Sequence, residues 1–239
     1  MLRVLSYAYW ALIAITCPFF FAVAVVIWLV TLPFDRRKVI LHQYSCAWAV
    51  FFIVINPLWK VRVTGREHLH WRGPAVLAAN HASLIDILVL FQLFRPFKWV
   101  SKIENFKLPF IGWNMRLNGY VPLLRGDRTS VMEMLERCSK LLKQGSPVLF
   151  FPEGTRSQDG TLRPFKDGAF QLARQHDVPL VPIAVHGTGA ALPKHGMVLQ
   201  EHVDAWVEIL EPMDPADYPS VESLRDAARD RIAAALAAR

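Results

Sequence analysis

A chain of 239 residues has room for one large domain, or for one domain and a membrane segment, and is too short for two full domains. Hydrophobic residues make up 53% of it and charged residues 20%, a composition that excludes intrinsic disorder. The formal net charge of +7 favours anionic partners, such as phospholipid surfaces, phosphorylated substrates or nucleic acid. The three cysteines (Cys17, Cys46 and Cys138) are odd in number and lack zinc-ligand spacing, so we expect a reducing compartment, no disulfide framework and no zinc site.

The apolar excess is concentrated in residues 1–59. Residues 4–34 contain no charged side chain and, as one helix, would reach about 46 Å, more than the roughly 30 Å of a bilayer core. Pro18 lies in the middle of this stretch, where proline can kink or break a helix. A second uncharged stretch covers residues 39–59, and the basic cluster at residues 36–38 between the two stretches suits anionic headgroups on the cytoplasmic leaflet.

We therefore expect residues 1–59 to form a pair of helices that anchors the protein to the cell inner membrane, or to another membrane facing the cytoplasm, with residues 60–239 on the cytoplasmic side. A single span followed by a surface helix is one alternative, and two buried core helices of a soluble protein are the other. The apolar stretch is too long for the hydrophobic region of a signal peptide, and no small-residue cleavage site follows it.

The second part of the chain, residues 60–239, alternates short apolar runs with helical periodicity. We expect strands near residues 61–63, 75–79, 120–123, 148–151, 180–185 and 203–210. Helices are expected at residues 83–94, 129–143, 168–175 and 220–237. This alternation predicts an α/β domain with a mostly parallel sheet flanked by helices.

The first polar motif, residues 80–86, directly follows an apolar strand, at a junction where α/β proteins place ligands. On a helix His81 and Asp86 would lie roughly 140° apart and could not meet. If His81 lies in the loop and Ser83 caps the helix, Asp86 in the first turn can reach the imidazole. The alternative is that Asp86 is the acid of a near capping box and His81 an ordinary loop histidine.

A second motif, residues 151–157, also follows an apolar strand, and residues 164–170 come soon after. With these blocks the sequence resembles the glycerolipid acyltransferase family, which includes the 1-acylglycerol-3-phosphate (lysophosphatidate) acyltransferases. The match covers about residues 65–185. The family's His-x4-Asp block matches His81 and Asp86, and its Phe-Pro-Glu-Gly-Thr-Arg-Ser block matches residues 151–157 in full. Its Val-Pro-Ile block matches residues 181–183, its Lys-x-Glu region matches Lys102, and its intervening arginine matches Arg125, although Leu124 stands where the family often has Asp or Asn.

The resemblance implies a membrane-bound enzyme that moves a fatty acyl group from acyl-CoA or acyl carrier protein to the sn-2 hydroxyl of a lysophospholipid, 1-acylglycerol 3-phosphate, giving phosphatidate. It implies no cofactor and no metal. An alcohol needs a base to attack a thioester at neutral pH, which suits His81, and a carboxylate such as Asp86 fixes the imidazole tautomer. Two arginines, Arg125 and Arg156, can hold a phosphate bidentately, and Glu153 can accept hydrogen bonds from glycerol hydroxyls or from arginine. The blocks place Lys102, Gly154 and Thr155 among the substrate-binding residues.

Other interpretations remain open at this stage. The acceptor could be another lyso-lipid or glycerol 3-phosphate itself, and a non-catalytic protein that binds anionic lipid or nucleic acid would explain the charge but not His81, Asp86 and Glu153. We expect no nucleic-acid partner. The chain has no Gly-x-Ser-x-Gly elbow, which favours direct transfer without an acyl-enzyme. Residues 187–189 read Gly-Thr-Gly but lack the third glycine of a dinucleotide-binding turn, and we assign them no function.

Overall fold

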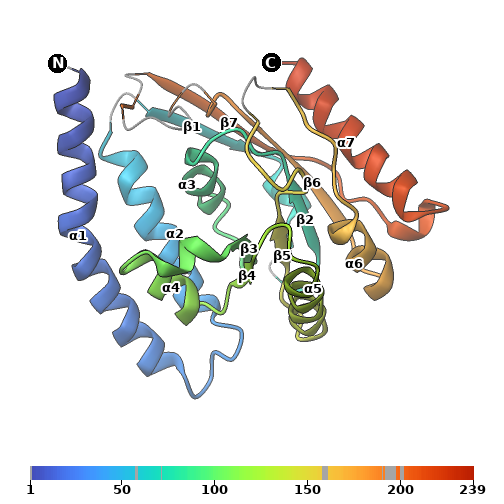
Figure 1. Cartoon of the computed structure of the whole chain (residues 1–239), viewed down its shortest axis with the longest axis horizontal. Helices are drawn as coiled ribbons and strands as arrows, with labels where there is room; N and C mark the ends of the chain where they lie inside the picture. The colour runs from blue at the N-terminus through green and yellow to red at the C-terminus, as the bar shows by residue number, and fades with distance from the viewer. Residues whose placement is uncertain are drawn as a thin grey trace.

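A computed structural model describes residues 2–56, 59–70, 72–157, 161–189, 191, 198–199 and 202–239. Its centre is a seven-stranded sheet with the strand order β1-β7-β6-β2-β5-β3-β4 (Figure 1). The strands are Trp59–Thr64 (β1), Val76–Ala79 (β2), Lys98–Lys102 (β3), Val121–Leu123 (β4), Val148–Phe150 (β5), Leu180–His186 (β6) and Val203–Ile209 (β7). All neighbouring strands run parallel except β6 and β7, which pair antiparallel. The mostly parallel sheet predicted from the sequence is confirmed.

Helices cover both faces of this sheet (Figure 1). They are Leu2–Thr31 (α1), Val39–Val54 (α2), Ile85–Phe91 (α3), Ile111–Leu117 (α4), Arg128–Lys143 (α5), Gly168–His176 (α6) and Val221–Ala237 (α7). One hydrophobic core joins the sheet to α3, with Leu90, Phe97 and Trp99 almost wholly buried. A second core joins the opposite face to α5, α6 and α7 and is centred on Phe170 and Leu224. The sheet is therefore buried on both faces, as parallel strands require.

Two elements were not predicted, β3 and α4. The sequence of β3 reads Lys-Trp-Val-Ser-Lys, and its charged first residue hides the strand pattern. Lys98 is nevertheless only 4% exposed, because its Nζ donates to the carbonyl oxygen of Asn118 at 2.7 Å. The helix expected at residues 83–94 is shorter, since α3 begins at Ile85 and ends at Phe91, a few residues ahead of Pro96.

The N-terminal segment forms the expected pair of helices, but Pro18 does not interrupt the first one. Helix α1 runs through this proline without a break. Packing just after the proline offsets the lost hydrogen bond: the Phe20 ring stacks on Trp48 of α2 with centroids 5.4 Å apart, and the Tyr44 hydroxyl donates to the Phe20 carbonyl at 2.9 Å. The two helices are therefore one packed unit.

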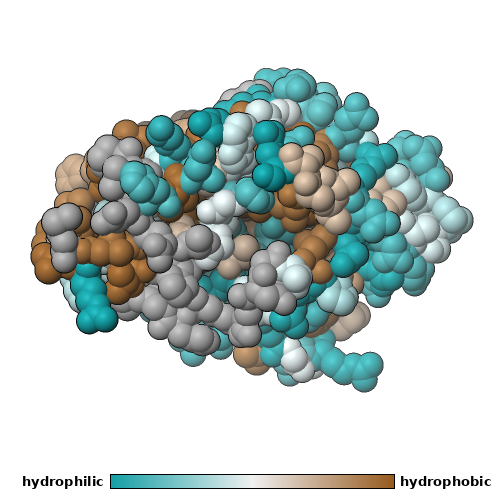
Figure 2. All heavy atoms as spheres, turned by 90° about the horizontal axis from the view of Figure 1, so that it is seen from above, coloured by the Kyte–Doolittle hydropathy of each residue, from teal (hydrophilic) through white to brown (hydrophobic). Residues whose placement is uncertain are grey.

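The two helices differ in burial. Helix α1 is long and apolar enough to cross a membrane, yet only 11% of its most apolar stretch is buried, and Ile15 and Phe19 are largely exposed. Figure 2 shows hydrophobic surface gathered at the end of the molecule where Figure 1 places α1, opposite the hydrophilic end at α7. Helix α2 instead packs on α3 and buries Leu41, Cys46 and Ile53. An exposed apolar helix of this size marks an interaction surface, and anchoring of residues 1–59 to a membrane stays a prediction.

Candidate active site

The two sequence blocks meet because their strands are neighbours in the sheet. Strand β2 lies between β5 and β6, all three running parallel, so their carboxyl ends open on one edge. Asn80, the first residue after β2, locks this edge: its Nδ2 donates to the Val185 carbonyl at 2.9 Å and its Oδ1 accepts from the Val185 N–H at 2.7 Å. The next residue, His81, therefore leaves the sheet at a fixed point.

His81 and Asp86 form a hydrogen-bonded pair. His81 lies in the loop before α3 and Asp86 in the first turn of this helix, and the Nδ1–Oδ2 distance is 2.8 Å. The same carboxylate oxygen accepts the main-chain N–H groups of Ala82 at 2.7 Å and Ser83 at 2.8 Å. The fold-back geometry expected from the spacing is present, although the helix begins two residues after Ser83. Asp86 thus organises the loop and contacts the imidazole at once.

A threonine to which we assigned no function from the sequence forms a hydrogen bond to this pair. Thr188, in the turn after β6, is fully buried, and its hydroxyl donates to Oδ1 of Asp86. Asp86 is itself 0% exposed, so no solvent replaces this donor. The sequence marks this position by a polar residue between two glycines directly after a buried strand. We assigned residues 187–189 no function because they lack the third glycine of a dinucleotide-binding turn.

The contacts of the imidazole define its tautomer. A carboxylate only accepts hydrogen bonds, so Nδ1 of His81 carries a proton, and in the neutral imidazole Nε2 keeps its lone pair. In the described part of the chain no hydrogen bond engages Nε2. The Phe151 ring stacks on the imidazole at 3.9 Å between centroids and 15° between planes, and Trp99 stacks behind it at 5.6 Å. The ring is thus held in one plane with a free proton acceptor.

Glu153 contacts the main chain of the site from the β5 side. Its Oε1 accepts the His81 N–H at 2.7 Å, and its Oε2 accepts the Arg163 N–H at 3.0 Å. Burial raises the pKa of this carboxyl, the Asp86 charge adds to the rise, and the two main-chain hydrogen bonds oppose it. We expected Glu153 to bind substrate, and in the structure each of its oxygens is already occupied by a main-chain donor.

The residues after Glu153 continue the second block. Gly154 adopts a positive φ of 72°, a conformation that favours glycine, and a Cβ there would lie 2.9 Å from Cε of the flexible Lys166 side chain. Thr155 and Arg156 follow as half-buried residues. The block therefore brings Lys166, a cation that was not among the predicted site residues, next to Gly154.

The remaining predicted residues lie at the ends of β3 and β4. Lys102 ends β3 and pairs with Glu104 at 3.2 Å, a half-exposed ion pair that contributes little to stability. Arg125 follows β4, and partial burial lowers its pKa, an effect opposed by the Glu104 carboxylate and reinforced by the Arg156 charge. Arg125 and Arg156 are thus close enough to interact, and together they make this edge cationic. Among the described residues no cluster of three or more His, Cys, Asp or Glu side chains could hold a metal.

Comparisons with known proteins agree with the blocks. A family model described as Acyltransferase matches residues 60–186. A 1-acyl-sn-glycerol-3-phosphate acyltransferase of Chlamydomonas reinhardtii is 40% identical over 240 residues, covering 98% of this chain and 70% of that protein. A chloroplastic relative of the same name from Brassica napus is 42% identical over 84% of this chain, which spans 58% of that protein.

A solved structure agrees as well. The crystal structure of the 1-acyl-sn-glycerophosphate acyltransferase PlsC from Thermotoga maritima superposes with a TM-score of 0.78 at 26% identity, covering 97% of this chain and 95% of that one. The resemblance first drawn from the sequence blocks is confirmed. On its sequence and its fold, this chain belongs to the acyltransferase family.

Proposed function

We propose that this protein transfers a fatty acyl group from a thioester donor, acyl-CoA or acyl carrier protein, to the sn-2 hydroxyl of 1-acyl-sn-glycerol 3-phosphate, giving phosphatidate. The observation that supports this most is the buried pair of His81 and Asp86, with Nε2 of the imidazole left free to accept a proton. The printed names of the relatives supply the acceptor class.

The proposed reaction needs no acyl-enzyme. Nε2 of His81 takes the hydroxyl proton as the acceptor oxygen attacks the thioester carbonyl, and the carbon–sulfur bond then breaks. The imidazolium returns the proton to the departing thiolate, so a free thiol and an ester result. Asp86 stays ionised and stabilises the imidazolium through Nδ1. A positioned base contributes about 10²- to 10⁴-fold in rate.

Supporting residues keep this base in place. Thr188 holds the second oxygen of Asp86, Glu153 holds the main chain of His81, and Phe151 fixes the plane of the ring. We assign the acceptor phosphate to Arg125 and Arg156, because a guanidinium presents two parallel donors to phosphate oxygens. Thr155 and Lys102 are proposed to contact substrate, whereas Gly154 supplies the conformation of the turn.

The membrane part of the proposal rests on α1. Its exposed apolar surface would rest in the leaflet that holds the lysophospholipid, and the basic residues of the loop after it, Arg36, Arg37 and Lys38, would meet anionic headgroups. The helical pair then anchors the α/β domain, residues 60–239, on the cytoplasmic side. Clean release of the full-length protein from membranes by high salt would contradict this arrangement.

The test of the activity is an acceptor panel. Purified full-length protein in detergent is incubated with labelled acyl-CoA or acyl carrier protein and with lysophosphatidate, its dephosphorylated monoacylglycerol, a lysophosphatidylcholine or glycerol 3-phosphate. We expect labelled phosphatidate as the main product. Equal use of monoacylglycerol and lysophosphatidate would refute the phosphate assignment, and preference for another acceptor would replace the proposed substrate by that one.

A further inference from the structure

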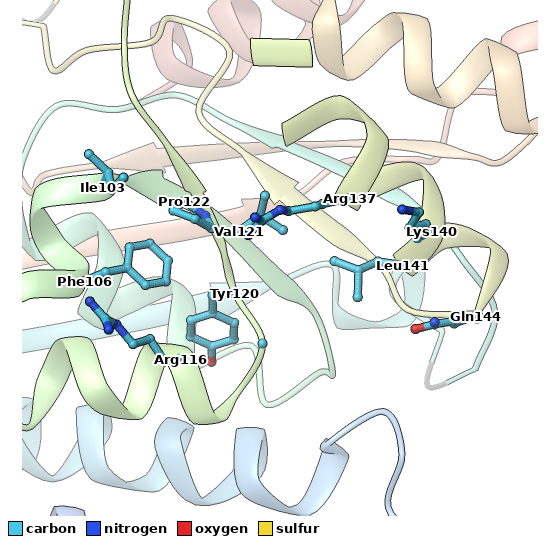
Figure 3. A pocket seen from close by; sticks show the side chains of 11 residues that line it. Ile103, Phe106, Arg116, Tyr120, Val121, Pro122, Arg137, Lys140, Leu141 and Gln144 are labelled. Carbon is cyan, nitrogen blue, oxygen red and sulfur yellow. The ribbon is translucent and has the colours of Figure 1, made fainter. Parts of the chain in front are cut away.

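A cavity of about 530 Å³ lies at the open edge of the sheet, apart from the site described above. It runs beside edge strand β4, between α4 on one side and α5 on the other (Figure 3). Its apolar lining includes Phe106, Tyr120 and Leu141. None of its lining residues belongs to the His81 and Asp86 constellation, so it has no part in the proposed chemistry.

Three cations surround this apolar floor: Arg116 from α4, and Arg137 and Lys140 from α5 (Figure 3). Lys140 is paired with Glu136 at 2.7 Å. In the described part of the chain, no carboxylate forms an ion pair with Arg116 or Arg137. Glu136 interacts with the Arg137 charge from a longer distance. Two guanidinium groups on opposite walls thus face a shared space without a directly paired carboxylate, which favours an anion that both can contact.

The cavity also borders the N-terminal helices. Nη1 of Arg37 donates to the carbonyl of Gly145, next to the lining residue Gln144, at 2.5 Å. A Cβ at Gly119, another lining residue, would lie 3.7 Å from Nζ of Lys38. The loop between α1 and α2 therefore brings two cations, Arg37 and Lys38, close to the residues that line the cavity. Helix α4 is tied to α1 as well, through the contact of Trp113 with Phe21.

We propose that this cavity binds one anionic phospholipid of the surrounding membrane, with its phosphate between Arg116 and Arg137 and the start of its chains against Phe106 and Tyr120. The ligand is an amphiphile because the walls are cationic and the floor is apolar. We infer that this amphiphile is a membrane lipid because the exposed apolar helix α1 lies beside the cavity. An added peptide strand is a poor fit, since β4 has only three residues and contains Pro122.

The test compares lipid retention by two double variants. Full-length protein in neutral detergent is mixed with phosphatidylglycerol or phosphatidylcholine at equal concentration, and native mass spectrometry measures the bound lipid. The wild type is expected to favour phosphatidylglycerol by at least about tenfold, and Arg116→Gln with Arg137→Gln to abolish the preference. Arg128→Gln with Arg231→Gln removes the same charge elsewhere on the exposed surface and should leave it intact.

Three results would overturn the proposal. Wild type without a preference would show that the cavity takes no anionic lipid. Equal losses in both double variants would show that net charge, and not this cavity, attracts the lipid. Displacement of the lipid by inorganic phosphate as effectively as by added phosphatidylglycerol would make free phosphate the ligand. Both arginines are exposed, so their substitution leaves the fold intact, and Arg116→Lys with Arg137→Lys, which keeps both charges, should retain part of the preference.

Discussion

Replacement of Thr188 by valine removes the first hydrogen bond of the chain that runs from Thr188 through Asp86 to the imidazole of His81. Valine has nearly the shape of threonine, so the core around the turn after β6 stays filled, but Oδ1 of Asp86 loses its hydroxyl donor. Both side chains are fully buried, and water does not substitute. A hydrogen bond to a charged group is worth about 1.5 to 3 kcal/mol.

If this loss falls on the transition state, where the imidazolium forms, kcat should drop about 10- to 140-fold at 1.4 kcal/mol per tenfold. The acceptor KM should change little, because the hydroxyl of Thr188 bonds to Asp86 and not to a predicted substrate-binding residue. The assay is steady-state transfer of a labelled acyl group in detergent, with Thr188→Ser as the matched control that keeps the hydroxyl. The serine variant should keep at least about half of the wild-type kcat.

Two results would refute this reasoning. A kcat of Thr188→Val within about twofold of wild type would show that the hydroxyl does not support Asp86 during catalysis. Equal losses in Thr188→Ser and Thr188→Val would assign the effect to the missing methyl contact or to altered packing. Thermal unfolding of each variant separates either result from a simple loss of fold.

Three further predictions follow from the site and the core. Glu153→Gln should destabilise the protein by about 1 to 3 kcal/mol and lower kcat, because the glutamine amide must point an N–H at the main-chain N–H of His81 or Arg163. An unchanged melting temperature and an unchanged kcat would contradict the assigned hydrogen bonds. Arg125→Lys and Arg156→Lys should each raise the KM for lysophosphatidate by about ten- to a hundredfold and leave that for monoacylglycerol nearly unchanged, so parallel losses for both acceptors would refute the phosphate clamp. Burial, reinforced by the Lys38 charge, lowers the pKa of Lys98 from 10.5 to about 7, so between pH 7 and 10.5 the unfolded chain binds more protons and stability should rise with pH by up to about 1.4 kcal/mol per unit. Thermal unfolding of wild type and Lys98→Met at pH 7, 8 and 9 should then show a stability difference that shrinks as pH rises, and a constant difference would contradict a buried lysine that loses its proton in this range.

Much of the fold was predictable because the strand-forming runs are apolar. Strands such as β2 and β6 are buried along almost their whole length, so their composition indicates a parallel sheet before any contact is known. Strand β3 was not predicted because its first residue is a lysine, Lys98. The group that allows this lysine to be buried, the carbonyl of Asn118, lies 20 residues away in the sequence. Pro18 indicated a kink or break in the first helix, but α1 is continuous because it packs against α2.

The site was predictable where its residues are close in sequence. The spacing of His81 and Asp86 lets the two side chains meet only if the loop between them folds back, and the structure has this loop. The contacts of Asp86 with Thr188 and of His81 with Glu153 span 102 and 72 residues, and they depend on β2 lying between β5 and β6. Strand order is not visible in a single sequence, so Thr188 had no apparent partner, and Glu153 was expected to contact substrate hydroxyls or an arginine and not the main chain of His81.

The most direct test of the account is the acyl-transfer rate of full-length His81→Ala, measured beside His202→Ala, which removes an exposed histidine outside the site. With lysophosphatidate as acceptor, His81→Ala should lose about 10²- to 10⁴-fold in kcat while its thermal unfolding matches wild type, and His202→Ala should keep the wild-type rate. A folded His81→Ala protein that transfers the acyl group at close to the wild-type rate would contradict the assignment of His81 as the base.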